Sequence, residues 1–309
     1  MKDRLGFHRS LPGYAPTPVR ELPGVAQELG LGAVLVKDES SRLGLPAFKI
    51  LGASWAVERA LREAPGTHTL IAASAGNHGR AVAHVASMRG LACLIFLPER
   101  ALPVRRRAIE REGAEVVVVD GSYEDTVAAA EAAGREPGVL VVADVGSSGP
   151  ASWVIDGYAT LFEEARAQAA YDVLLVPVGV GSLAAAAARH GAATGIPVFG
   201  VEPATAACLG AALAAGRPVR VETPGTVMAG LDCAEVSPAA WPALRDGIRD
   251  TVVVTDEQAR AAVAELDGHG LAIGESGAAP LAALRILAPR LDPASRVLLV
   301  ATEGRTGAG

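Results

Sequence analysis

The chain has 309 residues, half of them hydrophobic and 20% charged, with a formal net charge of −6. This length allows two core-bearing lobes or one large one, because single cores stop growing at roughly 250 to 300 residues. The mild negative charge excludes the electrostatic pattern of a nucleic-acid-binding protein. The only basic cluster, Arg105 to Arg107, is expected on an exposed helix. The chain has no long uncharged apolar run and no apolar stretch near Met1, which predicts a globular protein of the cytoplasm and not a membrane protein.

The cysteines and histidines show no pattern of a metal site. Cys93, Cys208 and Cys233 are widely spaced and form no Cys-x-x-Cys pair, and the histidines lack ligand spacing. A disulfide scaffold is equally unexpected from an odd number of cysteines. We interpret all three as packing thiols and predict no metal.

From Leu70 onward, short apolar runs alternate with alanine-rich helical stretches. This alternation is typical of parallel strands joined by crossover helices, so the sequence predicts an α/β fold with mostly parallel sheets. The expected strands are residues 34–37, 70–73, 93–97, 116–119, 140–143, 173–176, 198–201, 252–254 and 297–300. The expected helices include residues 79–88, 123–133 and 256–266, the last opened by a capping box of Thr255 and Gln258. The Gly- and Ser-rich loop 144–150 is interpreted as a crossing between lobes, and the Gly- and Pro-containing region 216–225 receives no interpretation.

Lys49 lies in the segment Pro46-Ala47-Phe48-Lys49-Ile50-Leu51-Gly52, among apolar neighbours at the start of a helical run. Apolar surroundings push a lysine amine toward its neutral, nucleophilic form, which bond formation with an aldehyde cofactor requires. Taken alone, a surface lysine whose stem covers apolar residues is the better interpretation.

The loop Ser74-Ala75-Gly76-Asn77-His78-Gly79 follows the expected strand 70–73 and opens a helix. Open α/β sheets bind ligands at the carboxyl ends of their strands. The Asn77 amide is suited to hydrogen-bond a cofactor oxygen while staying neutral. The alternative is a helix cap by Ser74 or Asn77 with glycines for the turn, and the loop by itself leaves both open.

A second glycine-rich loop, Gly179-Val180-Gly181-Ser182-Leu183, follows strand 173–176 and precedes a helix. Backbone N–H groups at that helix start and the Ser182 hydroxyl form a site for a phosphate dianion. Read as Gly-x-Gly-x-x-Ala with Glu202 about 20 residues on, the loop also fits a dinucleotide fingerprint. A nicotinamide-dependent oxidoreductase is therefore a competing hypothesis. A dinucleotide site explains neither Lys49 nor the Asn77 loop, whereas one small phosphorylated aldehyde uses all three.

The order of these motifs resembles the fold-type II, tryptophan-synthase-like pyridoxal-phosphate enzymes. Within that superfamily the chain is most similar to the diaminopropionate ammonia-lyases, from about residue 7 to residue 304. The segments that carry the resemblance are residues 7–8, 11–18, 36–40, 47–49, 76–80, 153–161, 228–231, 274–278 and 302–304. The resemblance implies two αβα lobes of three layers with the cofactor between them. The large cofactor-binding domain would comprise residues 1–52 and 149–309, and the small domain residues 53–148.

The resemblance also implies roles for individual residues. Lys49 would bind pyridoxal 5'-phosphate covalently and later move the Cα proton of the substrate, and Asn77 would contact the ring hydroxyl oxygen. Thr302 would face the pyridine nitrogen, where a neutral hydroxyl suits elimination better than transamination. The alternative for Thr302 is a strand-end threonine facing solvent. The phosphate would be held by Gly179, Val180, Gly181, Ser182 and Leu183.

The substrate side departs from the ammonia-lyase pattern. In that family the loop before Gly76 carries an aspartate that serves as base on the D-isomer, but Ala75 occupies the place here and cannot move a proton. Asp144 matches a second acid that assists the leaving group or holds the substrate amine, and it is otherwise an ordinary turn residue. The chain is also shorter than that family between residues 49 and 74 and between residues 255 and 274. The residues expected at the substrate are Ser74, Ala75, Gly76 and His78, although packing beneath the loop is the commoner role for such a histidine.

The sequence therefore predicts elimination of a β-substituent from a small L-amino acid such as 2,3-diaminopropionate, serine or threonine, giving a 2-oxo acid and ammonia. A β-replacement synthase is the near alternative. A nicotinamide-dependent oxidoreductase and a non-catalytic pyridoxal- or amino-acid-binding module are the alternatives from other classes. The expected partners are the amino-acid substrate and, as the resemblance suggests, a second copy in a homodimer. Neither nucleic acid nor a membrane is expected.

Overall fold

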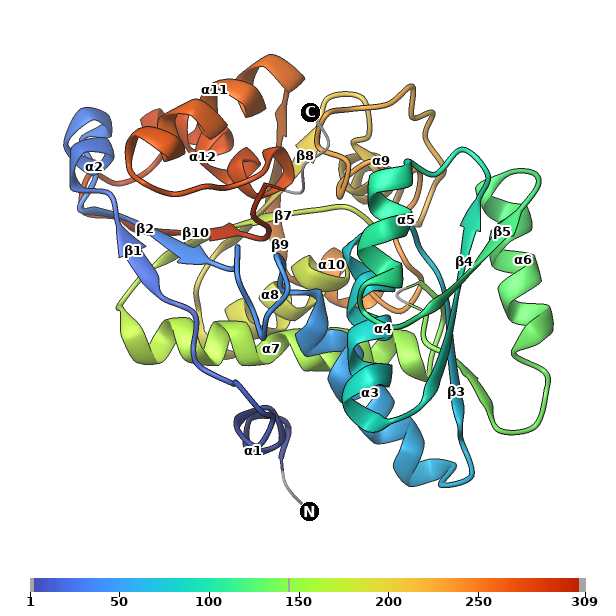
Figure 1. Cartoon of the computed structure of the whole chain (residues 1–309). Coiled ribbons are helices and arrows are strands. Elements are labelled where there is room, and N and C mark those ends of the chain that lie inside the picture. The colour runs from blue at the N-terminus through green and yellow to red at the C-terminus, as the bar shows by residue number, and fades with distance from the viewer. Residues whose placement is uncertain (1–2, 144, 306–309) are drawn as a thin grey trace. The chain divides into compact units, whose positions relative to one another are not determined.

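The computed structural model describes residues 3–143 and 145–305 (Figure 1). Its contacts divide the chain into two compact units, each with its own sheet. The four-stranded unit contains the described residues up to Ser10 together with Lys49–Gly157. The six-stranded unit contains Leu11–Phe48 and the described residues from Tyr158 onward. The division falls immediately before Lys49 and again within one long helix, α7 (Pro150–Gln168).

The four-stranded unit is built on a wholly parallel sheet with helices on both faces. Its strand order is β5-β4-β3-β6, and α6 covers one face while α4 and α5 cover the other (Figure 1). The core beneath α6 includes Ile71, Phe96 and Ala130. The strands are β3 (Thr69–Ala73), β4 (Ala92–Pro98), β5 (Glu115–Val119) and β6 (Val139–Val141). The helices are α1 (Arg4–Arg9), α3 (Lys49–Glu63), α4 (Asn77–Arg89), α5 (Pro103–Glu110) and α6 (Tyr123–Ala133).

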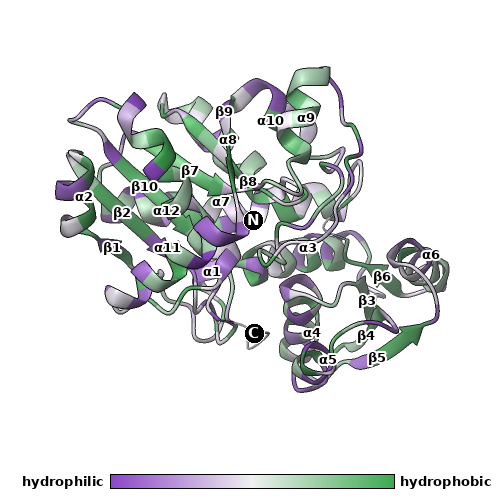
Figure 2. Cartoon of the chain, turned by 90° about the horizontal axis from the view of Figure 1, so that it is seen from above, coloured by the Kyte–Doolittle hydropathy of each residue, from purple (hydrophilic) through white to green (hydrophobic). Residues whose placement is uncertain are grey.

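The six-stranded unit has the strand order β1-β2-β10-β7-β8-β9, and only the β1–β2 pair is antiparallel. β7 and β8 are buried along their whole length, as expected where helices cover both faces of a parallel sheet. In Figure 2 the strands β2, β7 and β10 are mainly hydrophobic, whereas α2 and α11 carry hydrophilic segments. The strands are β1 (Val19–Glu21), β2 (Ala33–Asp38), β7 (Val173–Pro177), β8 (Val198–Pro203), β9 (Ile248–Val254) and β10 (Arg296–Ala301). The helices are α2 (Pro23–Leu29), α8 (Ser182–Thr194), α9 (Cys208–Ala215), α10 (Trp241–Gly247), α11 (Asp256–Gly268) and α12 (Glu275–Leu287), with a short 3-10 helix at Ala288–Arg290.

The predicted α/β class with mostly parallel sheets is confirmed, and every expected strand is present with shifted ends. The largest shift is at β9, which begins at Ile248 although residues 252–254 were expected. The sequence pattern did not predict β1, because three residues are too short for an alternating pattern. The domain boundaries at residues 53 and 148 stay a prediction, since the contacts group the segment before Leu11 and the first half of α7 with the four-stranded unit.

The capping box at the start of α11 gives a test of local stability. The Thr255 hydroxyl accepts a hydrogen bond from Gln258 N at 3.2 Å, and Gln258 Oε1 accepts one from Thr255 N at 2.8 Å. We expect Thr255→Ala to lower the free energy of unfolding by about 1 kcal/mol in urea denaturation, because it leaves a helix N–H without its partner. Thr255→Ser keeps the hydroxyl and should lose much less. Equal losses in the two variants would show that the cap contributes nothing.

Candidate active site

The loop after β7 forms an anion-binding arrangement in the six-stranded unit. The N-cap of α8 is Gly181, which has a φ of +90° and so favours glycine, and no side chain caps this helix. The first N–H groups of a helix have no partner within it and carry a partial positive charge. Ser182 is 3% exposed and Leu183 5%, so these groups are shielded from bulk water, while Gly179 and Val180 are half-buried. The arrangement fits a phosphate dianion.

Gly179 brings a second segment against this loop. A Cβ atom at Gly179 would lie 2.7 Å from Gly230 O and 3.2 Å from Cys233 Sγ, so a larger residue does not fit without movement. Gly230 N in turn donates a hydrogen bond of 3.1 Å to the Ser276 hydroxyl in the first turn of α12. Three segments that are far apart in the sequence therefore meet beside the glycine-rich loop.

Segments from distant parts of the chain also contact one another at the end of β10. Phe48 N donates to Thr302 O at 3.3 Å, and Gly274 N donates to Glu303 O at 3.0 Å. Thr302 is 5% exposed, so the alternative of a threonine facing solvent is wrong. Because Lys49 is bonded to Phe48, their Cα atoms are about 3.8 Å apart. The main chain that leads into Lys49 is thus fixed next to Thr302.

In the four-stranded unit, Lys49 is the first residue of α3 and is half-buried between the buried Phe48 and Ile50. The loop 74–79 connects the end of β3 to α4, as predicted. The N-cap of α4 is Gly76 and no side chain caps it, so the alternative of a cap by Ser74 or Asn77 is wrong. In this loop Ser74, Ala75 and Asn77 are half-buried and Gly76 is exposed.

His78 and Gly79 fix the loop through contacts with backbone carbonyl groups. His78 is 3% exposed, and its Nε2 lies 2.7 Å from Val142 O, to which it donates. A Cβ atom at Gly79 would lie 2.1 Å from Ser74 O, so the tight return of the loop requires glycine. These contacts agree with a packing role for His78. Asp144, the second predicted acid, lies outside the described residues.

Glu202 decides against the dinucleotide interpretation. Its carboxylate is fully buried and accepts hydrogen bonds from Leu209 N at 2.6 Å and Gly210 N at 2.9 Å, at the start of α9. Burial raises the pKa of Glu202 to about 7, although the two N–H donors act in the opposite direction. A carboxylate bound to the N–H groups at the start of α9 is not presented to the ribose of a dinucleotide.

The residue types predicted to bind the cofactor fit pyridoxal phosphate chemically. Backbone N–H groups at α8 suit its phosphate, the hydroxyl of Thr302 and the amide of Asn77 suit the ring's polar atoms, and the amine of Lys49 suits its aldehyde. Residues 11–303 match the family model described as pyridoxal-phosphate dependent enzyme. The chain belongs to this family. The family assignment and the environment of Glu202 together exclude the nicotinamide-dependent alternative.

The similar proteins are pyridoxal-phosphate enzymes of fold type II. The diaminopropionate ammonia-lyase of Salmonella typhimurium is 33% identical over 98% of this chain and 88% of its own length. The crystal structure of the Escherichia coli diaminopropionate ammonia-lyase with D-serine has a TM-score of 0.90 at 31% identity, over 98% of this chain and 88% of that one. The T.th. threonine deaminase has a TM-score of 0.87 at 28% identity, over 98% and 97% of the two chains. The Salmonella alignment runs over 356 positions against the 309 residues here, so that relative carries additional segments.

Two parts of the site were not assigned roles from the sequence. Residues 228–231 and 274–278 carry the family resemblance, but only the structure shows that the first packs on Gly179 and the second on Glu303. The string Gly274-Glu275-Ser276-Gly277 between a short loop and an apolar helix was the available signal, because small residues at a helix start permit close main-chain approach.

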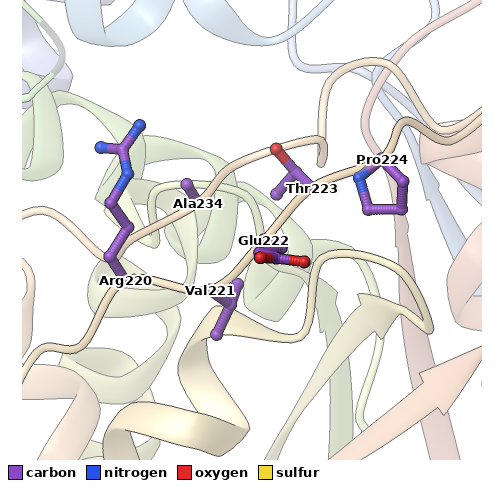
Figure 3. Close-up of a pocket in the computed structure, with 6 residues that line it drawn as sticks. All are labelled: Arg220, Val221, Glu222, Thr223, Pro224 and Ala234. Carbon is purple, nitrogen blue, oxygen red and sulfur yellow. The ribbon is translucent and has the colours of Figure 1, made fainter.

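The irregular region 216–225 lines a separate hollow. Its volume is about 510 Å³. The residues that line it, labelled in Figure 3, are Ala234 and, from this region, Arg220, Val221, Glu222, Thr223 and Pro224. None of the predicted site residues lines it.

Among the described residues, no helix combines the length and the apolar character needed to cross a membrane.

The contact between Gly179 and Gly230 gives a test of the phosphate loop. We expect Gly179→Ala to weaken the binding of pyridoxal phosphate about tenfold, because overpacking against a backbone oxygen displaces the loop. The dissociation constant would be measured by fluorescence titration of the apoenzyme. Gly24→Ala is the matched control, since a Cβ atom at Gly24 meets nothing within 4 Å. Unchanged affinity in Gly179→Ala would count against this loop as the phosphate site.

Proposed function

We propose that the protein eliminates a β-amino or β-hydroxyl group from a small L-amino acid and releases a 2-oxo acid and ammonia. The supporting observation is the similarity to diaminopropionate ammonia-lyase along 98% of the chain. Within the chain, the glycine-rich loop opens α8 and Lys49 opens α3, as the family resemblance predicts. The threonine deaminase similarity supports the same class of reaction.

Pyridoxal phosphate, when bound, supplies an electron sink conjugated with the Cα atom of the substrate. We assign to Lys49 the covalent attachment of the cofactor and the removal of the Cα proton, which requires the neutral amine. Lys49 is the first residue of α3 and is half-buried between two apolar residues.

The remaining assignments concern binding and orientation. The N–H groups of residues 179–183 would hold the phosphate, and the Asn77 amide would donate to the ring hydroxyl oxygen. The hydroxyl of Thr302 would face the ring nitrogen and, being neutral, would leave the ring less electron-withdrawing than a carboxylate would. Ser74, Gly76 and His78 belong to the loop expected at the substrate. Asp144 would assist the leaving group or hold the substrate amine, on the basis of the sequence alone.

Ala75 is the basis for proposing the L-isomer. The Escherichia coli relative has been crystallised with D-serine. The aspartate that serves as base on the D-isomer in the ammonia-lyases is replaced here by Ala75, whose methyl group accepts no proton. Removal of the Cα proton is then left to Lys49, on a single face of the substrate.

The stereochemical proposal is tested with both enantiomers of 2,3-diaminopropionate, serine and threonine. We expect release of 2-oxo acid from an L-isomer at least about tenfold faster than from its D-isomer, because only one base is present. Ala75→Asp should raise the rate on the D-isomer relative to the L-isomer, and Ala75→Ser is the control without a proton acceptor of that strength. Faster turnover of a D-isomer by the unchanged protein would refute the assignment.

The assignment of Lys49 is tested by chemical labelling. Borohydride reduction followed by peptide mapping should place the pyridoxyl group on Lys49. Lys49→Arg should keep the fold but lose the label and the elimination activity, because an arginine side chain is not deprotonated in proteins. A label on another lysine would overturn the proposed function.

The β-replacement alternative differs only in the step after elimination. Added thiols or amines would then yield new amino acids in place of 2-oxo acid, which mass spectrometry detects. A non-catalytic binding module would take up the cofactor but show no spectral change with any amino acid.

We further propose that the protein is a cytoplasmic homodimer, on the basis of the family resemblance, and light scattering would measure the number of chains.

A further inference from the structure

A cluster of four ionisable side chains is buried in the six-stranded unit, and the proposed chemistry does not use it. Lys37, Glu39 and Arg42 are at most 1% exposed and Glu164 is 5% exposed. Lys37 lies near the end of β2, Glu39 and Arg42 lie in the segment that follows it, and Glu164 lies in α7. Two positive and two negative groups balance in charge, which is the condition for burying ions at low cost.

Arg42 is the centre of this cluster. Its Nε and Nη2 donate to the two carboxylate oxygens of Glu39 at 2.9 and 2.7 Å. Its Nη1 and Nη2 donate to the two oxygens of Glu164 at 2.8 and 2.7 Å. Further acceptors are the Thr17 hydroxyl at 2.9 Å and Ala15 O at 3.3 Å. All three guanidinium nitrogens are therefore engaged, in a geometry that a lysine cannot reproduce.

The carboxylates of the cluster have partners on their other sides as well. Tyr14 Oη donates to Glu164 at 2.6 Å, Lys37 Nζ donates to Glu164 at 2.9 Å, and the Thr17 hydroxyl donates to Glu39 at 2.5 Å. Burial alone lowers the pKa of Arg42, but the neighbouring carboxylates outweigh it and hold that pKa above its ordinary value. A fully satisfied buried network of this kind defines one arrangement of the main chain.

The turn after Arg42 depends on that arrangement. Arg42 N donates to Leu45 O at 2.8 Å and Leu45 N donates to Arg42 O at 3.0 Å, which closes a two-residue turn. Leu43 has a φ of +52° and Gly44 a φ of +80°, and Leu43 is the only non-glycine with positive φ in the described part of the chain. Such a leucine persists only where its surroundings over-determine the backbone.

The same segment is joined to the end of β10. Glu39 N donates to Ala301 O at 2.9 Å, Gly304 N donates to Pro46 O at 3.0 Å, and Phe48 N donates to Thr302 O. The segment 39–48 is thus fixed by the Arg42 cluster near its start and by β10 at both ends. Its last residue is bonded to Lys49.

We propose that Arg42 is a positioning residue for Lys49. By anchoring the segment 39–48 on Glu39 and Glu164, it fixes the path of the main chain that ends at Phe48 and leads directly into Lys49. Arg42 touches neither cofactor nor substrate in this role. The proposal rests on the proposed function, in which Lys49 carries the cofactor and moves the proton.

The test compares Arg42→Lys with Leu266→Ala as holoenzymes. Lysine keeps the charge but offers one donor atom. Leu266, 1% exposed in α11, belongs to the apolar core and not to the Arg42 cluster, and its truncation is expected to lower stability. For Arg42→Lys we expect a fall in kcat of about tenfold or more with a change in KM of less than about threefold. The visible circular dichroism of the bound cofactor should weaken, and the amides of residues 40–48 should exchange with solvent faster even in the apoprotein. Leu266→Ala should keep kcat within about twofold and leave the dichroism unchanged.

Unchanged dichroism and kcat within about twofold in Arg42→Lys would overturn the proposal. If Arg42→Lys does not fold, Thr17→Val removes one shared partner of Arg42 and Glu39 at similar volume. Its kcat should then fall about threefold or more while that of Leu266→Ala does not, and equal effects would refute the proposal. A wild-type protein whose pyridoxyl label maps away from Lys49 would instead refute the proposed function, and the exchange of residues 40–48 would still report whether Arg42 holds the segment.

Discussion

Main-chain hydrogen bonds at the carboxyl end of β10 join the segments that carry the chemistry of the six-stranded unit. Thr302 O accepts from Phe48 N, Glu303 O accepts from Gly274 N, and Gly304 N donates to Pro46 O. Backbone bonds of this kind do not depend on which side chain is present, so they hold irregular strings of residues in place. Because Phe48 is bonded to Lys49, the first residue of α3 is attached directly to this fixed main chain.

Close approach of one main chain to another is the second requirement, and glycine meets it. Gly179 leaves room for Gly230 O at a distance where a Cβ atom would collide, and Gly79 does the same for Ser74 O. In both places a loop after a parallel strand turns sharply into a helix that no side chain caps. Glycine is needed at both positions because it has no Cβ atom at the point of contact.

The groups proposed to bind the cofactor differ in charge from the buried ionic groups of the six-stranded unit. The residues proposed to contact the cofactor offer neutral hydroxyl, amide and N–H groups and one amine. The buried ionic groups of the Arg42 cluster and the Glu202 carboxyl have hydrogen-bond partners of their own. Neutral groups around the ring suit a reaction that eliminates a β-substituent and does not transfer the amino group.

The alternation of apolar runs and helical stretches was enough to predict the strands, because parallel strands covered on both faces are apolar throughout. The loops of residues 74–79 and 179–183 were also recognisable, since a ligand loop between a strand and a helix needs glycine and small polar residues locally. The capping box of Thr255 and Gln258 is equally local and is confirmed. The three-residue strand β1 carried too little pattern to be found.

The sequence by itself determined the fold class, the two glycine-rich loops and the lysine that opens α3, because each depends on residues within a few positions of one another. Only the tertiary structure decided that Thr302 is buried beside Phe48, that Glu202 binds the start of α9, and that Arg42 meets Glu164 across 122 positions of the chain. Such pairs are brought together by the order of strands in the sheet, and no local pattern of residue types records that order.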